Sequence, residues 1–331
     1  MVKNTNEFEE KKVIITGGLG FIGSNLAHRL IDLGAIVTLI DNLSPEYGGN
    51  LFNVTEIKDR LHINISDVRD ASSMAYLVQG KDYIFNLAGQ TSHLDSMHDP
   101  FTDLQINCVA QLSILEACRK NNPNVKVIYA GTRQIYGRPM YLPVDEKHLL
   151  QPTDVNGINK MAGEWYHILY NNVYGIRAVS LRLTNTYGPR MRVKDDRQTF
   201  LGIWIKRLIE NDPLQVYGDG QQVRDFNYID DVVDALISAA LQEEANGRIY
   251  NLGSSEVINL KDLAELMINI NNCGSYDIIP FPGDRKKIDI GDYYSDYSLI
   301  QKELNWNPKV SLNEGLSKTI AFYRNCRSNY W

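Results

Sequence analysis

Three glycines between a strand pattern and a helix pattern constrain the fold of this chain more than any other feature. A short β-branched run precedes Gly17, Gly20 and Gly23, and a helical pattern continues to about residue 33. At this spacing the first glycine permits a tight turn, the second lets backbone N–H groups reach a pyrophosphate, and the third lets the helix pack on the strand. The turn therefore predicts a dinucleotide site. The alternative is a glycine-rich turn that only allows helix and strand to pack closely.

The next apolar run, residues 35–40, ends on an acid. Asp41 lies about 24 residues after Gly17, near the distance at which a carboxylate bonds the ribose hydroxyls of an adenosine. A negative charge at this position repels the 2′-phosphate of NADP. The sequence therefore favours NAD as the cofactor.

Strand and helix patterns continue to alternate along the first half of the chain. Further strand patterns cover 61–65, 83–87, 125–130 and 176–183, and helix patterns cover 71–78, 101–120 and 154–173. This alternation predicts an α/β protein with a Rossmann doubly wound parallel sheet. Ligands of such a sheet bind outside the carboxyl ends of its strands.

The length of 331 residues predicts a second, smaller lobe. We expect residues 1–180 to form the NAD-binding Rossmann domain, whose core also takes a later segment of about 225–255. Residues 181–331 are expected to form mainly a C-terminal α/β substrate-binding lobe. Its patterns predict helices at 200–210, 230–242 and 260–270, with loops at 187–199 and 213–225.

Composition argues against several kinds of partner and site. The formal net charge is −6 and no basic run stands out, which argues against nucleic acid as a main partner. The N-terminal segment is polar and no apolar run approaches the roughly 20 residues of a membrane span, so we expect a cytoplasmic protein without membrane contact. The four cysteines lack the spacing of zinc ligands or of a disulfide framework, so no metal site is expected.

Ordered motifs follow the glycine turn over most of the chain. They are Asp67-Val68-Arg69-Asp70, Asn86-Leu87-Ala88-Gly89-Gln90, Tyr136-Gly137, Lys160 to Glu164, Leu181 to Arg190, and Gly218 to Phe226. From about residue 12 to residue 323 the chain resembles the extended short-chain dehydrogenase/reductases that act on nucleotide sugars, the NAD-dependent epimerase/dehydratase family. It is similar in particular to the UDP-glucose 4-epimerase and CDP-tyvelose 2-epimerase branches.

The resemblance assigns cofactor roles to residues at the carboxyl edge of the predicted sheet. These are Gly17, Gly20, Phe21, Ile22 and Gly23 at the pyrophosphate, Asp41 and Asn42 at the adenosine ribose, Asp67 and Val68 at adenine, Leu87, Ala88 and Gln90 along the cleft, and Lys160 at the nicotinamide ribose.

The resemblance also implies a nucleotide-diphosphate sugar as substrate. Thr132 matches the family's catalytic Ser/Thr, and Asn185 and Arg224 match residues that bind the diphosphate, as a guanidinium fork does well. Gln134 and Arg190 are further candidates for substrate binding. Each role has a structural alternative: Thr132 could cap a turn, Asn185 could be a loop residue, and Arg224 could pair with Asp225.

Two departures from the family pattern fall at the reacting centre. Asn156 stands four residues before Lys160, where the resemblance places an acid/base tyrosine, and asparagine cannot exchange a proton at neutral pH. Arg133-Gln134 stands where a 4,6-dehydratase carries Asp-Glu. Asn156 could still donate a hydrogen bond to a sugar oxygen. His93, just past Gln90, is a candidate replacement base, and Lys160 is a second one.

Two classes of function remain open from the sequence. The first is an NAD-dependent nucleotide-sugar epimerase, which removes a hydride and returns it to a transient keto-sugar, or a related dehydratase or reductase with a non-standard acid/base. The second is a protein that binds NAD(H) and a sugar nucleotide without catalysis. The helix patterns at 101–120 and 154–173 correspond to those that form a dimer interface in the family, so a homodimer is expected.

Overall fold

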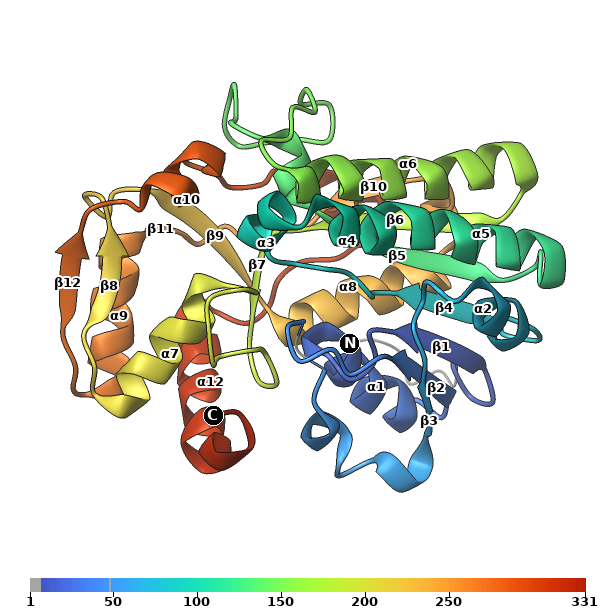
Figure 1. Cartoon of the computed structure of the whole chain (residues 1–331), viewed down its shortest axis with the longest axis horizontal. Helices are drawn as coiled ribbons and strands as arrows, with labels where there is room; N and C mark the ends of the chain where they lie inside the picture. The colour runs from blue at the N-terminus through green and yellow to red at the C-terminus, as the bar shows by residue number, and fades with distance from the viewer. Residues whose placement is uncertain (1–6, 48) are drawn as a thin grey trace.

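The computed structural model describes residues 7–47 and 49–331. Residues 1–6 of the polar N-terminal segment lie outside this part of the chain. The larger lobe is built on a seven-stranded parallel sheet in the order β10-β6-β5-β4-β1-β2-β3 (Figure 1). Its strands are β1 (Lys12–Thr16), β2 (Ile36–Asp41), β3 (His62–Ile65), β4 (Tyr83–Asn86), β5 (Lys126–Thr132), β6 (Arg177–Leu183) and β10 (Ile249–Asn251).

Helices cover both faces of this sheet (Figure 1). One face carries α1 (Phe21–Asp32), α8 (Ile229–Leu241) and α11 (Ser298–Leu304); the other carries α2 (Ala71–Leu77), α4 (Pro100–Leu104), α5 (Ala110–Asn121) and α6 (Val155–Tyr174). Separate apolar cores fill the two sides, one around α1 and α8 and one around α2 and α5. The prediction of a doubly wound Rossmann sheet is therefore confirmed.

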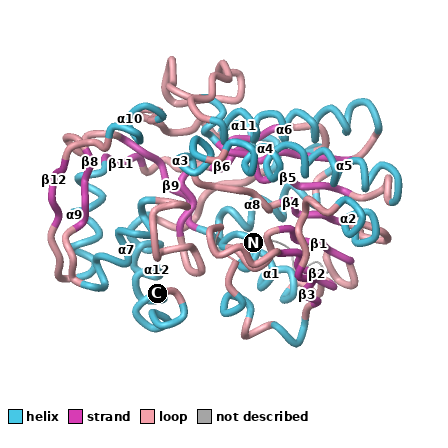
Figure 2. The backbone as a smooth tube through the Cα atoms, in the orientation of Figure 1, coloured by secondary structure: helices cyan, strands magenta, loops and turns pink. Residues whose placement is uncertain are grey.

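The smaller lobe lies beyond the carboxyl ends of the large sheet (Figure 2). It contains a three-stranded sheet in the order β11-β9-β7 and a two-stranded parallel sheet of β8 and β12. Its elements are β7 (Asn185–Tyr187), α7 (Phe200–Glu210), β8 (Leu214–Tyr217), β9 (Val223–Tyr228), β11 (Val257–Asn259), α9 (Leu260–Asn271), β12 (Tyr276–Ile279), α10 (Gly283–Ile288) and α12 (Leu312–Cys326).

The turn between β1 and α1 shows why glycine is needed at two of its positions. Gly17 has φ +66°, and a Cβ there would lie 3.1 Å from the backbone of Ala88. A Cβ on Gly23 would lie 2.3 Å from the carbonyl oxygen of Gly17. Larger side chains would therefore push β4 or α1 away from the turn. This close packing brings the N-terminus of α1 next to the end of β4.

Several local predictions need correction. The helix predicted over 101–120 is interrupted by a π-helical segment, Gln105–Val109, between α4 and α5; π segments are frequent at functional sites. The loop predicted at 213–225 contains β8, whose partner β12 follows some sixty residues later and leaves no local signal. A short helix, α3 (His93–His98), follows β4. In the described residues, no helix is both long and apolar enough to span a bilayer.

Candidate active site

Two adjoining pockets lie at the carboxyl ends of the large sheet. The interlobe pocket, of about 750 Å³, is lined by residues that follow β4, β5 and β6 and by α7, β9 and α10 of the small lobe. The glycine-turn pocket, of about 130 Å³, lies beside the turn between β1 and α1. Phe21, Ile22 and Leu87 line both pockets. The two therefore form one cleft across the edge of the sheet.

The glycine-turn pocket gathers most of the predicted cofactor residues. Those lining it are Gly17, Gly20, Phe21, Ile22, Gly23, Asp41, Asn42, Asp67, Val68, Leu87 and Ala88. Gln90 and Lys160 line the interlobe pocket instead. The set fits an adenine dinucleotide, because a helix N-terminus offers N–H groups to phosphate and two carboxylates stand where ribose and adenine are expected.

The carboxylate of Asp41 is fixed at the end of β2. Its Oδ2 accepts from the Leu19 N–H at 3.0 Å and its Oδ1 from the Leu43 N–H at 2.9 Å. Burial raises the pKa of Asp41, and these two N–H groups partly offset the effect. Asp67 is ion-paired with Arg69 at 2.7 Å, which holds its pKa at about 2. Two carboxylates therefore stand at the adenosine end of the pocket, and the second of them is paired with Arg69.

Lys160, on α6, lines the interlobe pocket. Its Nζ donates to the Ala130 carbonyl at 2.6 Å and lies 4.5 Å from the centroid of the Tyr129 ring. Burial lowers the pKa of Lys160 to about 8, and the negative charges of Asp103 and Glu164 partly offset that effect. An ammonium has three donors. Two of them therefore stay free for a ligand.

Thr132 and Gln134 both line the interlobe pocket and both have structural partners. Thr132 ends β5, and its Oγ1 accepts from the Gln134 N–H at 3.2 Å, so it does cap the turn that follows. The hydroxyl hydrogen of Thr132 is still available to donate to a ligand. The Nε2 of Gln134 donates to Asp154 Oδ2 at 2.8 Å. The Gln134 nitrogen thus supports another side chain rather than pointing freely into the pocket.

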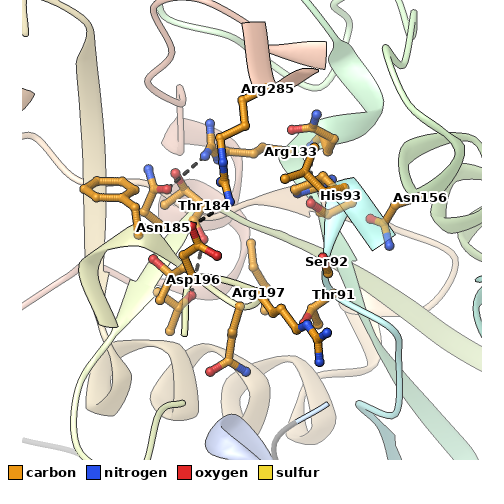
Figure 3. A pocket seen from close by; sticks show the side chains of 18 of the residues that line it. Thr91, Ser92, His93, Arg133, Asn156, Thr184, Asn185, Asp196, Arg197 and Arg285 are labelled. Atoms are coloured by element: carbon orange, nitrogen blue, oxygen red, sulfur yellow. Dashed lines mark hydrogen bonds and ion pairs between the residues drawn. The ribbon is translucent and has the colours of Figure 1, made fainter. Parts of the chain in front are cut away.

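Asn156 is tied into a buried polar network. Its Nδ2 donates to the Gln90 carbonyl at 2.8 Å and to Asp103 Oδ2 at 3.0 Å, and the residue is only 3% exposed. Asp103 also accepts from Asn107 and Asn159. In Figure 3 Asn156 stands apart from the group around Arg133. Asn156 lines the interlobe pocket, but both of its amide hydrogens are used within the protein, so its donation to a sugar oxygen stays a prediction.

His93 begins α3 and lines the interlobe pocket (Figure 3). Its Nδ1 lies 2.9 Å from Oδ2 of Asp154, although the N–H direction is poorly aligned for a linear hydrogen bond. Asp154 is the N-cap of α6. The structure therefore brings a histidine and a buried carboxylate together. The carboxylate belongs to Asp154, two positions before Asn156 in the chain.

In the small lobe Asn185 and Arg224 both reach the interlobe pocket. Asn185 accepts from Arg133 Nη2 at 2.8 Å and donates to the Asp225 carbonyl at 2.9 Å. Arg224 pairs with Asp289 at 3.6 Å, so the alternative of a pair with the side chain of Asp225 is wrong. Burial, and then the charge of Arg133, lower the pKa of Arg224 to about 10. Arg224 therefore stays cationic at neutral pH.

Arg190 does not line either pocket, and its role in substrate binding stays a prediction. Its Nη1 donates to Asn25 Oδ1 at 2.9 Å and its Nε to the Asn53 carbonyl at 3.1 Å. The residue has a left-handed backbone, φ +72°, that turns its side chain toward α1. Arg190 thus joins the two lobes.

Sequence reasoning missed three participants. Arg133 stacks on Tyr293, and its Nη1 is buried without a partner among the described residues. Asp154 was not singled out, although it lies close to Asn156. Arg285 belongs to α10 and pairs with Asp196 at 2.6 Å inside the pocket (Figure 3). Arg133 and Asp154 could have been found from the sequence because each lies within two positions of a predicted site residue.

Residues 13–253 match the model of a family described as the NAD dependent epimerase/dehydratase family. The chain belongs to this family. A putative UDP-glucose 4-epimerase of Methanocaldococcus jannaschii is 31% identical over 95% of this chain and 98% of its own length. A UDP-N-acetyl-alpha-D-glucosaminuronate decarboxylase of Bacillus cytotoxicus is 30% identical over 95% of this chain and 98% of its own length. Relatives of this epimerase/dehydratase chain therefore include both epimerases and decarboxylases.

Solved structures show the same fold. The UDP-glucuronic acid 4-epimerase of Bacillus cereus, in complex with UDP-glucuronic acid and NAD, superposes with a TM-score of 0.83 at 26% identity, over 95% of this chain and 99% of that one. Together with the family match and the residues of the glycine-turn pocket, this establishes NAD as the cofactor.

Proposed function

We propose that this chain is an NAD-dependent nucleotide-sugar epimerase that acts through a transient keto-sugar. One observation carries the proposal: a single cleft joins the dinucleotide residues to a cationic pocket in the small lobe, and Thr132 and Lys160 line the interlobe part of that cleft. A diphosphate between Arg224 and Asn185 would direct the attached sugar toward Thr132 and Lys160. The 4-epimerases among its relatives support the same reaction type.

Each residue of the cleft has a part in this reaction. NAD, when bound, accepts a hydride from the sugar carbon and returns it. Lys160 holds the nicotinamide ribose with its free donors, and its positive charge favours the oxyanion that forms as the hydride leaves. Thr132 bonds the reacting sugar oxygen through its hydroxyl hydrogen. Arg224 binds the diphosphate through two parallel N–H groups, which fixes the position of the attached sugar relative to the cofactor.

The residues after Thr132 favour epimerisation over dehydration. Removing water from a sugar needs an acid for the leaving hydroxyl and a base for the carbon-bound proton. At this position the chain has Arg133 and Gln134. Arginine keeps its proton in proteins, and a glutamine amide does not titrate. Hydride removal and return, by contrast, needs only the cofactor and one group that exchanges the hydroxyl proton.

The proposal is tested with purified protein, NAD and a panel of UDP-, CDP-, GDP- and dTDP-sugars, with the products followed by NMR. We expect one epimer pair to interconvert, with no net change in absorbance at the NADH band because the reaction is redox-neutral. A sugar lacking its carboxyl carbon, or a 4-keto-6-deoxy product, would show a decarboxylase or a dehydratase. Tight binding of a sugar nucleotide without conversion would favour the non-catalytic alternative.

We also infer that the chain forms a homodimer through α6. Ile158, Trp165, Leu169 and Val173 follow helical spacing along one side of α6 and are 49–60% exposed. An exposed apolar stripe of this kind is typical of a protein interface. Light scattering should give a dimer for the wild type and a monomer for Leu169→Glu. Tyr76→Glu, at an exposed apolar position on α2, is the control and should remain dimeric.

A further inference from the structure

The position of the expected tyrosine lacks a proton-transfer group, and His93 stands beside it. His93 is the first residue of α3, the short helix after β4, whereas Asn156 lies in the first turn of α6. The link between them is Asp154, which caps α6 and lies 2.9 Å from His93 Nδ1. The imidazole is therefore held at the same helix end that would carry the tyrosine.

The surroundings of Asp154 keep its side chain in the ionised carboxylate form. Its side chain is fully buried, its Oδ1 accepts from the Gly157 N–H at 2.6 Å, and its Oδ2 accepts from Gln134 Nε2 at 2.8 Å. Burial raises the pKa of Asp154, but His93, the Gly157 N–H and Gln134 outweigh that effect and hold it below its usual value. A buried carboxylate of this kind fixes the orientation of the histidine ring beside it.

The other edge of the His93 ring is open to the interlobe pocket. The side chain is 39% exposed, and it shares the pocket with Thr132 and Lys160. Because Nδ1 faces Asp154, Nε2 is the nitrogen left for a ligand. Figure 3 places the ring between Arg133 and Asn156 in that view. A hydroxyl of a bound sugar can therefore approach Nε2.

Three other proton carriers near the interlobe pocket are less suited than His93 to meet the sugar hydroxyl. Lys160 gives one hydrogen to Ala130 and serves the cofactor. Tyr136 is buried and bonded to Asn251 and Arg182. Among the described residues that line the interlobe pocket, the tyrosine is Tyr217, which lies on β8 in the small lobe and packs on Phe281. His93 is the group at the Lys160 end of the pocket with a free nitrogen.

We infer that His93, held by Asp154, is the acid/base that stands in for the tyrosine; this inference rests on the proposed epimerase function. Nε2 takes the proton of the sugar hydroxyl as the C–O bond gains double-bond character. The C–H bond breaks at the same carbon, and its two electrons leave with the hydrogen as hydride to NAD⁺. On return of the hydride to the opposite face of the keto carbon, protonated His93 gives the proton back to oxygen. The protein and the cofactor end unchanged.

The test compares His93→Asn with His98→Asn in the full-length protein. His98 ends the same short helix and is exposed outside both pockets, which makes it a matched control. We expect His93→Asn to lose on the order of 10²- to 10⁴-fold in kcat with NAD affinity unchanged. The His98→Asn variant should behave as wild type. Added imidazole should restore part of the activity of His93→Gly.

Asp154→Asn tests the second member of the pair. Asparagine is as good an N-cap as aspartate, so α6 keeps its first turn while the charge beside His93 is lost. We expect kcat to fall with little change in KM, because Asp154 lies behind the histidine and does not reach the substrate. A purely structural role would instead lower stability and raise KM together.

The outcomes separate this inference from the proposed function. A wild type that binds sugar nucleotides but converts none rejects both. An active wild type whose His93→Asn variant keeps activity within about threefold, or whose His93→Gly variant ignores imidazole, rejects the role of His93 alone. Loss of NAD binding in His93→Asn would show a folding defect, and the imidazole rescue of His93→Gly then decides.

Discussion

Replacing Asn156 by tyrosine should destabilise the protein rather than restore a missing group. The asparagine Nδ2 donates to the buried carboxylate of Asp103 and to the Gln90 carbonyl. A hydrogen bond to a charged group is worth about 1.5 to 3 kcal/mol, and forcing a larger side chain into a packed site costs about 1 to 3 kcal/mol. We therefore expect Asn156→Tyr to lower the free energy of unfolding by roughly 2.5 to 6 kcal/mol, and Asn156→Ala by about 2 kcal/mol.

The change in the free energy of unfolding is measured by urea unfolding followed by circular dichroism, with Asn172→Ala as the control. Asn172 is an exposed asparagine on the same helix, and its loss should change stability by less than about 0.5 kcal/mol. A double-mutant cycle with Asp103→Asn isolates the contact, since removing the charge first should reduce the cost of Asn156→Ala by about 1 kcal/mol or more. Equal effects of Asn156→Ala and Asn172→Ala, or a coupling near zero, would refute the network.

Three further predictions concern the cofactor, the substrate and pH. Asp41→Asn should reduce the preference for NAD over NADP by on the order of tenfold, since it removes the charge that repels the 2′-phosphate; titration calorimetry with both cofactors measures it, and an unchanged ratio contradicts the role. Arg224→Ala should weaken sugar-nucleotide binding by about 1.5 to 3 kcal/mol and leave NAD affinity unchanged, as seen in the same calorimeter. Burial lowers the pKa of His167 to about 4, from 6.5, so folding favours its neutral ring. Stability should fall as pH drops from 6.5 to about 4, by up to about 3 kcal/mol, and His167→Gln should lose that part of the slope in unfolding curves.

The elements that sequence predicted well are those whose requirements are local. The β1–α1 turn needs glycine because a Cβ on Gly17 would lie 3.1 Å from the backbone of Ala88, and such a need is visible in the glycine spacing of a few adjacent residues. The cofactor side chains follow strands of the same sheet, so the order of strands was enough to group them. The pairing of β8 with β12 was missed because its partners are far apart in the chain.

Side-chain partners at the site could not be read from sequence for a similar reason. The amide of Asn156 could have served a sugar oxygen, but its acceptor is Asp103, 53 residues away on α4. Arg190 was a candidate for substrate binding, yet its guanidinium donates to Asn25, 165 residues away in the chain. His93 was a candidate by position alone. What the structure added is Asp154, which gives the ring a fixed orientation.

One helix carries both the site and the apolar stripe. Asp154, Asn156 and Lys160 belong to the first turns of α6 or to its cap, while Trp165 and Leu169 stand exposed further along it. An α-helix of 20 residues is about 30 Å long and moves largely as a rod. If a second copy covers the stripe, the partner steadies the segment that positions the cap and the ammonium. Specific activity should then decline on dilution, which makes protein concentration a quantity to control in any kinetic comparison of variants.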